Sequence, residues 1–183
     1  MIFQPITVQL KNGASAVVRN AEPEDAENLI KYLKTTAAES PYLMRNPQEI
    51  QITLEEEINF INGQKEAKRS LMLIGEIDGN HAGNASCMSL GEYQRYAHRC
   101  SVAIALYQKY CGLGLGEIMF RTVLEKAKEI GYEQAELEVV TTNTNAIALY
   151  EKLGFQSYGT QRHSMKYSDG SYADEYLMMK ILQ

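Results

Sequence analysis

A glycine-rich run, residues 108–116, constrains the fold of this 183-residue chain more than any other segment. It follows an apolar stretch at 102–106 and leads into a long segment with helical spacing of apolar residues. Glycines let a backbone approach a ligand closely, and the first turn of a helix presents N–H groups without partners and a partial positive charge. A strand, a glycine-rich turn and a helix in this order therefore predict a site for a phosphate-bearing ligand.

Two common nucleotide-binding loops do not fit this run. A Walker loop ends in Gly-Lys-Ser/Thr, whereas Gly116 is followed by Glu117. A dinucleotide-binding loop needs glycine at its first, third and sixth positions. Counted from Gly112 the sixth residue is Glu117, and counted from Gly114 it is Met119. The loop therefore argues against a nucleotide kinase and against a dehydrogenase.

The remaining sequence reads as one domain over residues 1–183 with both strands and helices. Asn12-Gly13 is a strong hairpin signal between two apolar segments. Antiparallel hairpins come first, and strand, helix, strand, helix, strand follow, which predicts an α/β or α+β sheet domain. Strands are expected at 6–10, 14–19, 70–77, 82–89, 99–107, 135–140, 155–160 and 176–182, and helices opening within 20–25 and running over 53–63, 114–130 and 144–153.

Charge and cysteine usage exclude several classes of function. The formal net charge is −5, which argues against broad binding to nucleic acids or anionic membranes. No apolar run approaches the roughly 18 residues of a membrane span, and the first residues lack the pattern of a signal peptide. Cys87, Cys100 and Cys111 form no C-x-x-C pair and the histidines are scattered, so neither a disulfide framework nor a metal site is predicted. A reduced, cytoplasmic compartment is expected.

Three blocks of sequence carry a family resemblance. The glycine-rich run resembles the acetyl-CoA loop Arg/Gln-x-x-Gly-x-Gly/Ala of the GNAT (GCN5-related) N-acetyltransferases. Gly114 and Gly116 take glycine positions, and Cys111 stands where arginine or glutamine is usual. Asn143–Phe155 resembles the family's asparagine and following helix, ending in Leu-Tyr-Glu-Lys-Leu-Gly-Phe, and residues 169–179 resemble the closing hairpin of bacterial members. The chain is thus identified as a small bacterial member of this superfamily.

The resemblance implies a fold and a reaction. The fold is a mixed, mostly antiparallel sheet of six to seven strands, flanked by about four helices and split in a V between its fourth and fifth strands. The reaction uses acetyl-CoA as co-substrate and no metal. The acetyl group passes directly, in a ternary complex, to the primary amine of a small molecule such as an amino acid or a similar amine.

The resemblance also assigns residues to the co-substrate. The loop backbone should hold the pyrophosphate, and the preceding strand should pair with the pantetheine arm. Lys109 would add a point charge near the phosphates, although a solvated surface lysine fits its position equally well. Asn143 should cap its helix, worth about 1 kcal/mol, and by resemblance contact the cofactor arm. The cofactor-binding set is Ile104, Ala105, Leu106, Lys109, Cys111, Gly112, Leu113, Gly114, Leu115, Gly116 and Asn143.

Tyr150 is the predicted general acid, because it aligns with the family's tyrosine beside the thioester sulfur. A phenol with a pKa near ~10 can protonate a departing thiolate at neutral pH. Its helical neighbours are apolar, so a core aromatic with a polar tip is the alternative. For the general base the candidates are Glu39, Glu92 and His98, and the alternative is that each is a surface charge and that water removes the proton.

Other functions stay open from the sequence. Within the class, the acceptor could be a protein N-terminus, a ribosomal protein or a polyamine. The acidic run 55–57 suits a polyamine cleft, and it suits a solvated helix face as well. Outside the class, the alternative is a non-catalytic acyl-CoA-binding sensor. Homodimers are common among such folds, so a homodimer is one expected state.

Overall fold

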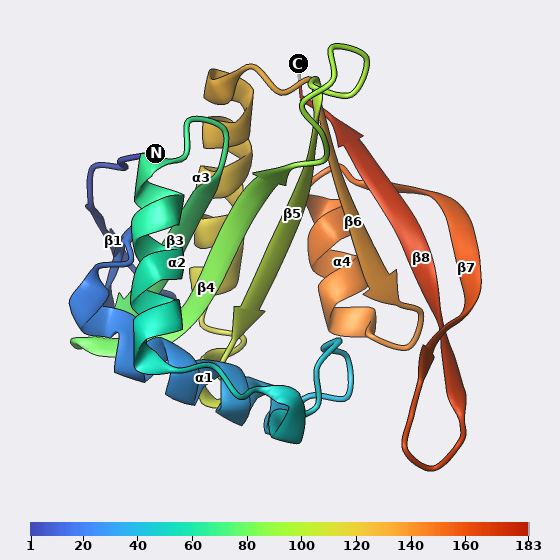
Figure 1. Cartoon of the computed structure of the whole chain (residues 1–183), viewed down its shortest axis with the longest axis horizontal. Coiled ribbons are helices and arrows are strands. Elements are labelled where there is room, and N and C mark those ends of the chain that lie inside the picture. Colours follow the sequence, from blue (N-terminus) through green and yellow to red (C-terminus); the bar gives the residue numbers. More distant parts are fainter. Residues whose placement is uncertain (183) are drawn as a thin grey trace.

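Eight strands form one mixed sheet in the computed structural model, which describes residues 1–182 (Figure 1). Their spatial order is β1-β2-β3-β4-β5-β6-β8-β7, and neighbours are antiparallel except β5 and β6, which are parallel. The count exceeds the expected six to seven because the N-terminal hairpin adds both of its strands to one edge. The strands are β1 (Ile6–Gln9), β2 (Ser15–Asn20), β3 (Leu71–Ile77), β4 (Asn80–Ser89), β5 (Arg99–Leu106), β6 (Gln134–Val140), β7 (Gln156–Lys166) and β8 (Tyr172–Ile181).

Four α-helices flank the sheet: α1 (Ala26–Glu39), α2 (Leu54–Glu66), α3 (Leu115–Ile130) and α4 (Thr144–Lys152). Thr53 caps α2 as predicted, since its Oγ1 accepts the N–H of Glu56 at 3.2 Å and its own N–H donates to the Glu56 carboxylate at 2.8 Å. α2 runs past Gly63, the predicted end, because one internal glycine costs a helix only about 1 kcal/mol. Within residues 1–182, no helix combines the length and apolar character that crossing a membrane requires.

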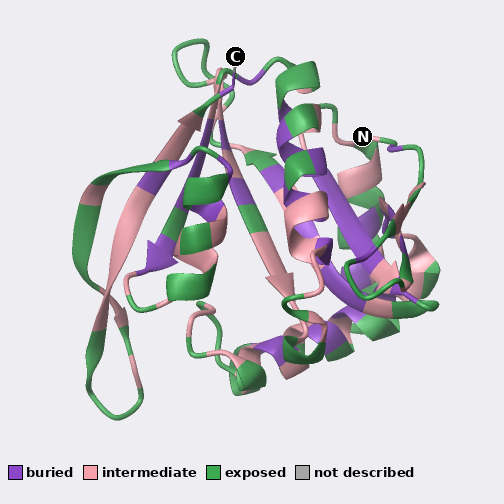
Figure 2. Cartoon of the chain, turned by 180° about the vertical axis from the view of Figure 1, so that it is seen from behind, coloured by how far each residue is buried: buried purple, intermediate pink, exposed green. Residues whose placement is uncertain are grey.

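Two hydrophobic cores lie on opposite faces of the sheet. The larger core packs α3 and α4 against the strands and includes Leu73 and Phe120. The smaller core packs α1 and α2 on the other face and includes Leu29 and Met72. Met72 and Leu73 are neighbours in β3 yet belong to different cores, since successive strand residues point to opposite faces. Burial follows this arrangement, with buried positions along the central strands and on one side of α3 (Figure 2).

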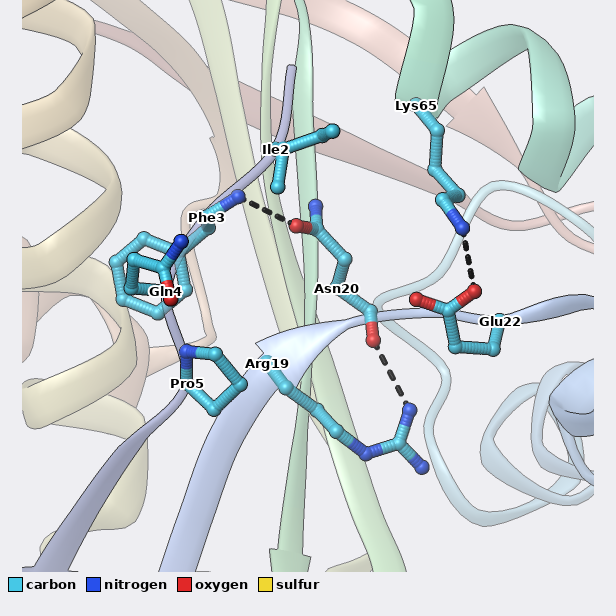
Figure 3. A pocket seen from close by; sticks show the side chains of 8 residues that line it. All are labelled: Ile2, Phe3, Gln4, Pro5, Arg19, Asn20, Glu22 and Lys65. Carbon is cyan, nitrogen blue, oxygen red and sulfur yellow. Dashed lines mark hydrogen bonds and ion pairs between the residues drawn. The ribbon is translucent and has the colours of Figure 1, made fainter.

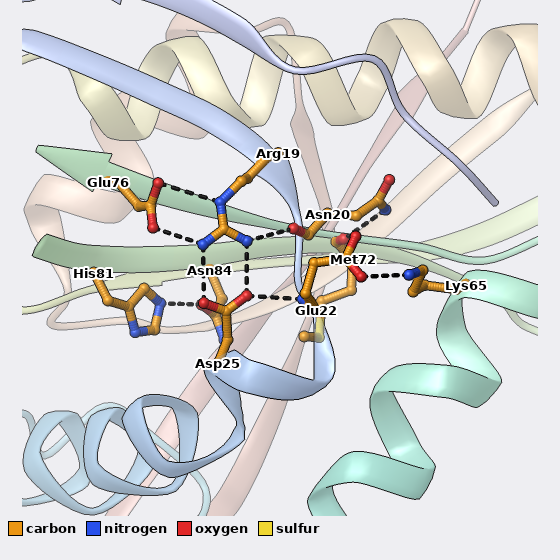
Figure 4. A network of polar contacts seen from close by, with 9 residues as sticks. All are labelled: Arg19, Asn20, Glu22, Asp25, Lys65, Met72, Glu76, His81 and Asn84. Atoms are coloured by element: carbon orange, nitrogen blue, oxygen red, sulfur yellow. Dashed lines mark hydrogen bonds and ion pairs between the residues drawn. The ribbon is translucent and has the colours of Figure 1, made fainter. Parts of the chain in front are cut away.

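An ion-pair network ties β2, β3 and the start of α1 together (Figure 4). The guanidinium of Arg19 lies 2.7 Å from a carboxylate oxygen of Asp25 and 2.6 Å from one of Glu76. Asp25 also accepts the N–H of Glu22 at 2.7 Å. Because Asp25 is the N-cap residue of α1, the network fixes where this helix begins on the sheet.

The sheet divides between β5 and β6. β5 pairs with β4 along its length from Cys100 to Leu106, but it pairs with β6 only from Arg99 to Ser101. This paired part is the closed end of the split. Beyond it, no strand within residues 1–182 pairs with the two edges that face each other, 102–106 in β5 and 137–140 in β6. The split lies between the fifth and sixth strands, one place later than expected, because β1 adds a strand at the N-terminal edge. The glycine-rich loop follows β5 at the open end of the split.

Candidate active site

The glycine-rich loop forms a cradle of backbone N–H groups at the start of α3. Residues 108–110 make one 3-10 turn, and Gly112 and Gly114 have φ values of 79° and 94°. Within the described residues, no N–H group of 112–117 donates to an acceptor in the chain. The first to do so is that of Ile118, which bonds the carbonyl of Gly114 at 3.2 Å. These free N–H groups and the positive end of the helix favour an anion.

Two glycines of the loop are required by geometry. Gly114 is the N-cap residue of α3 in the left-handed conformation, which costs a residue with a side chain about 1–2 kcal/mol. At Gly116, an added Cβ would lie 3.2 Å from Cδ1 of Leu106 at the end of β5. The missing side chain of Gly116 therefore lets the start of α3 pack closely on β5.

Cys111, the residue that departs from the motif, turns back on its own chain. Its Sγ lies 3.6 Å from the carbonyl oxygen of Tyr107. Burial, followed by the nearby charge of Glu39, raises the pKa of the Cys111 thiol. The thiol is therefore protonated at neutral pH, adds no charge to the loop and is a poor nucleophile.

Lys109 lies on the α1 side of the loop. Its Nζ is 4.7 Å from the ring centre of Tyr110 and 5.7 Å from that of Tyr107. With Lys31 and His81, Lys109 lines an open hollow of about 360 Å³ between α1, the β3–β4 turn and the loop. A contact between Lys109 and phosphates stays a prediction.

The edge of β5 beyond the closed end suits an extended ligand. The backbone of Ala105 faces β4 and not the split, because the N–H of Tyr107, two residues further along, donates to the carbonyl of Ala82 in β4 at 3.0 Å. The carbonyl of Ala105 also accepts the hydroxyl of Tyr32 in α1 at 2.8 Å. Backbone groups alternate in direction along a strand, so those of Ile104 and Leu106 point toward the split. Of the three predicted residues in β5, these two are therefore placed to pair with a ligand there.

Tyr150 projects from α4 into an aromatic cluster on the α3–α4 face. Its ring centre lies 5.3 Å from that of Phe120 and 6.0 Å from that of Phe155, and the residue is 7% exposed. The Tyr150 hydroxyl makes no hydrogen bond within the described residues. It is not among the fully buried polar atoms without a partner, so part of its surface is open to solvent. Burial raises the pKa of Tyr150 to about 12. Tyr150 thus has a packed ring and an accessible, protonated hydroxyl.

Asn143 begins α4, the helix that carries Tyr150. Its Oδ1 accepts the N–H of Ala146 at 3.3 Å, which confirms the predicted cap. Its contact with a co-substrate stays a prediction.

The three predicted base candidates lie at different ends of the sheet. Glu39 ends α1 beside the loop, where its carboxylate accepts the N–H of Gln108 at 2.8 Å. Glu92 lies in the exposed loop between β4 and β5, and His98 directly precedes β5. At about 3.3 Å per residue, His98 is about one strand length from the glycine-rich loop. The structure therefore brings Glu39 to the loop and places Glu92 and His98 beyond the closed end of the split.

A fourth carboxylate, which the sequence analysis missed, borders the split. Glu138 lies in β6 two residues beyond Glu136, the last residue paired with β5. Its neighbours Leu137 and Val139 belong to the larger core. Glu138 therefore points to the opposite face, where it is exposed. The alternation of residues 135–140 was the available signal, but it does not reveal that the strand borders a gap.

A hollow near the N-terminus lies outside this site (Figure 3). It measures about 270 Å³ and is lined by residues 2–5 and by side chains of β2, the following turn and α2. Its polar groups largely satisfy one another: Asn20 Oδ1 accepts the N–H of Phe3 at 2.6 Å, and Lys65 pairs with Glu22. None of the predicted site residues lines it.

The family model described as acetyltransferase (GNAT) family matches residues 28–155 of this chain. The chain belongs to the GNAT family. It is therefore an acyltransferase with the fold of that family.

Individual GNAT proteins are similar over nearly the whole chain. The N-alpha-acetyltransferase of Sulfurisphaera tokodaii is 28% identical over 181 residues, which cover 93% of this chain and 95% of that protein. A GNAT-family acetyltransferase of Streptococcus pneumoniae has a TM-score of 0.86 at 29% identity, covering 91% of this chain and 99% of that one. A phosphinothricin acetyltransferase of Sinorhizobium meliloti, solved in complex with acetyl-CoA, has a TM-score of 0.79 at 16% identity, covering 91% and 88%.

Proposed function

We propose that this GNAT protein transfers an acetyl group from acetyl-CoA to a primary amine by direct attack in a ternary complex. The observation that carries the proposal is the cradle of free N–H groups at 112–117, at the open end of the β5–β6 split. A cradle at a helix N-terminus suits a pyrophosphate. An unpaired strand edge suits an extended arm with amide groups.

The residues of the site fit acetyl-CoA, which would supply a thioester-linked acetyl group. The N–H groups of 112–117 would bind the phosphates, and the backbone of Ile104 and Leu106 would pair with the arm. Tyr150, with a pKa of about 12, would keep a proton on its hydroxyl and give it to the departing thiolate.

Acid and base would act from opposite faces of the sheet. Tyr150 belongs to the core on the α3–α4 face, and Glu138 points to the other face at the same split. We assign Glu138 to remove a proton from the acceptor ammonium. The carboxylate of Glu39 is already bonded to the N–H of Gln108, and the other two candidates lie beyond the closed end.

The proposed acceptor is the amine of a small molecule, and an observation at Arg99 favours one without an adjacent carboxylate. Arg99 is the one cationic side chain that β4, β5, β6 and β8 place on the Glu138 face, within the described residues. Its Nε and one of its terminal nitrogens donate to the carboxylate of Glu136, the terminal nitrogen at 2.6 Å, so its charge is paired. A free amino acid would find no unpaired cation on these strands for its carboxylate.

The second candidate acceptor is the N-terminus of a polypeptide, where the neighbouring carboxyl group is in an amide. The same observation supports it, and so does the name of the Sulfurisphaera relative. A polyamine gains less support from the acidic run 55–57. Glu56 is used in the cap of α2, and Glu57 is 5% exposed, with burial raising the pKa of its carboxyl group.

The test is release of free thiol from acetyl-CoA in the presence of a matched amine panel. The panel holds amino acids, their amides, short peptides with the same first residue, and polyamines. Thiol release with at least one amine, faster for amides or peptides than for free amino acids, is expected. Tight CoA binding with no release across the panel would instead support an acyl-CoA sensor. Absence of CoA binding would refute the proposed role of the cradle.

A further inference from the structure

The N-terminal hairpin brings a lysine to the cradle. Its turn is fixed by two hydrogen bonds, from the N–H of Leu10 to the carbonyl of Ala14 and from the N–H of Gly13 to the carbonyl of Leu10, both 2.9 Å. Leu10 itself is buried in the larger core. The N–H of Lys11 takes no part in the turn and donates to the carbonyl of Leu113 at 3.3 Å. The hairpin and the glycine-rich loop are therefore joined at this point.

The side chain of Lys11 lies beside Gly114, the N-cap residue of α3. Its Cγ and Cε are 3.5 Å, and its Cδ 3.7 Å, from the position that a Cβ of Gly114 would occupy. Lys11 is exposed, and it forms no ion pair within the described residues. Its ammonium, one bond beyond Cε, is thus an unpaired positive charge beside the start of α3.

Other charged side chains near the cradle already contact groups of the protein. Glu117, in the first turn of α3, is held by Arg121 at 3.0 Å and by Lys152 at 2.5 Å. Lys109 packs against tyrosine rings on the α1 side. Cys111, where a cation is common in the resembling motif, carries a thiol whose pKa is raised. Lys11 is therefore a cation beside Gly114 that pairs with no carboxylate within the described residues.

We propose that Lys11 binds the phosphates of the acyl-CoA co-substrate and supplies positive charge at the start of α3, where Cys111 stands in place of the cation of the resembling motif. The inference rests on the proposed function. A point charge beside backbone N–H donors strengthens binding of a polyanion. Lys11 lies outside the blocks of sequence that carry the family resemblance, and its position depends on the contact between the hairpin and the glycine-rich loop.

The test compares Lys11→Met with Lys128→Met. The second variant also removes one positive charge, but from the last turn of α3, far from the start of that helix. We expect the Kd of CoA to rise about tenfold in Lys11→Met, equal to about 1.4 kcal/mol, and to stay unchanged in Lys128→Met. Lys11→Arg should restore most of the affinity. The rise should shrink as salt is added, because the contact is exposed.

S-acetylpantetheine, which carries the thioester arm without the phosphates, separates charge from loop structure. Its kcat/KM should be equal in wild type and Lys11→Met, and an equal loss with this substrate would overturn the proposal. An unchanged Kd for CoA in Lys11→Met would overturn it too, whereas a wild type that binds no CoA would refute the proposed function. With dephospho-CoA, a persisting rise assigns Lys11 to the pyrophosphate, and its disappearance assigns it to the 3′-phosphate.

Discussion

Tyr150 combines a packed ring with a free hydroxyl, and mutation can separate the two. In Tyr150→Phe the contacts with Phe120 and Phe155 remain, while the proposed proton donor is lost. We expect kcat to fall by about 10²-fold, with the Kd of CoA and the thermal midpoint unchanged. Stopped-flow or steady-state thiol release measures the rate. An unchanged kcat would leave Tyr150 as a core aromatic.

Glu138 yields a prediction with a distinct pH signature. Glu138→Gln should lower kcat/KM for the acceptor by about 10²-fold at neutral pH, because its amide cannot take a proton from the ammonium. The loss should shrink at high pH, where more of the amine is already neutral. Glu133→Gln, an exposed carboxylate beyond the closed end, is the matched control. A variant that keeps most of its activity would shift attention to Glu39.

Individual site residues differ in how readily the sequence reveals them. Asn143 and Tyr150 share one short helix, so a local motif fixes their spacing. Glu138 matters because β5 leaves β6 after Ser101, and Lys11 because a hairpin contacts a loop about a hundred positions away. Neither relation is encoded in nearby residues. For the predicted bases Glu92 and His98, the sequence does not show that β5 is paired with β6 at their end of the strand.

At the scale of elements, the Arg19 network joins the start of α1 to β2 and β3. We expect it to determine how far the stability of the protein falls in acid. Burial alone would raise the pKa of Asp25, but hydrogen bonds from Arg19 and from the N–H of Glu22 outweigh it and hold the pKa below its ordinary value. A carboxyl group with a lowered folded-state pKa stabilises the protein above its unfolded-state pKa, near ~4. That contribution is lost as the pH falls through the lower, folded-state pKa. Thermal midpoints between pH 7 and pH 2 measure it.

Removing one partner of the network tests the same point. Arg19→Met should cost about 3 kcal/mol at pH 7, because two largely buried carboxylates lose their cation, and the acid dependence should flatten. Arg162→Met, which removes a highly exposed partner of Asp174 at 3.6 Å, should leave the midpoint nearly unchanged. Equal effects of both variants would contradict the role of the network.

Helix ends that carry a local signal are largely predictable, although Gly63 does not end α2. The capping box at Thr53, the cap at Asn143 and the left-handed Gly131 are local signals, and the structure has each of them. Strand lengths were less predictable: β7 reaches Lys166 and β8 begins at Tyr172 because the two pair into a long hairpin. The position of the split was implied by resemblance, and the extra N-terminal strand shifted it by one.

At the scale of the whole molecule, the cysteines report on the fold. Cys87 and Cys100 are buried and Cys111 is exposed, and burial raises the pKa of Cys87 to about 11 and that of Cys100 to about 12. A thiol reagent should titrate one cysteine in the native protein and all three after unfolding. Acetyl-CoA should slow the native reaction, since Cys111 lies in the proposed phosphate loop. Rapid reaction of a second thiol in the native state would contradict the burial pattern.

Because β5 and β6 diverge after Ser101, the inner edges of both strands lack a partner strand beyond that residue, within the part of the chain that the structure describes. The two inner edges, residues 102–106 and 137–140, face each other across the split. In the proposed complex, a ligand would pair with the edge of β5 in place of a polypeptide segment. Amide hydrogen exchange at Ile104 and Leu106 should therefore slow markedly on CoA binding, while exchange at Ala103 and Ala105, which face β4, should change little.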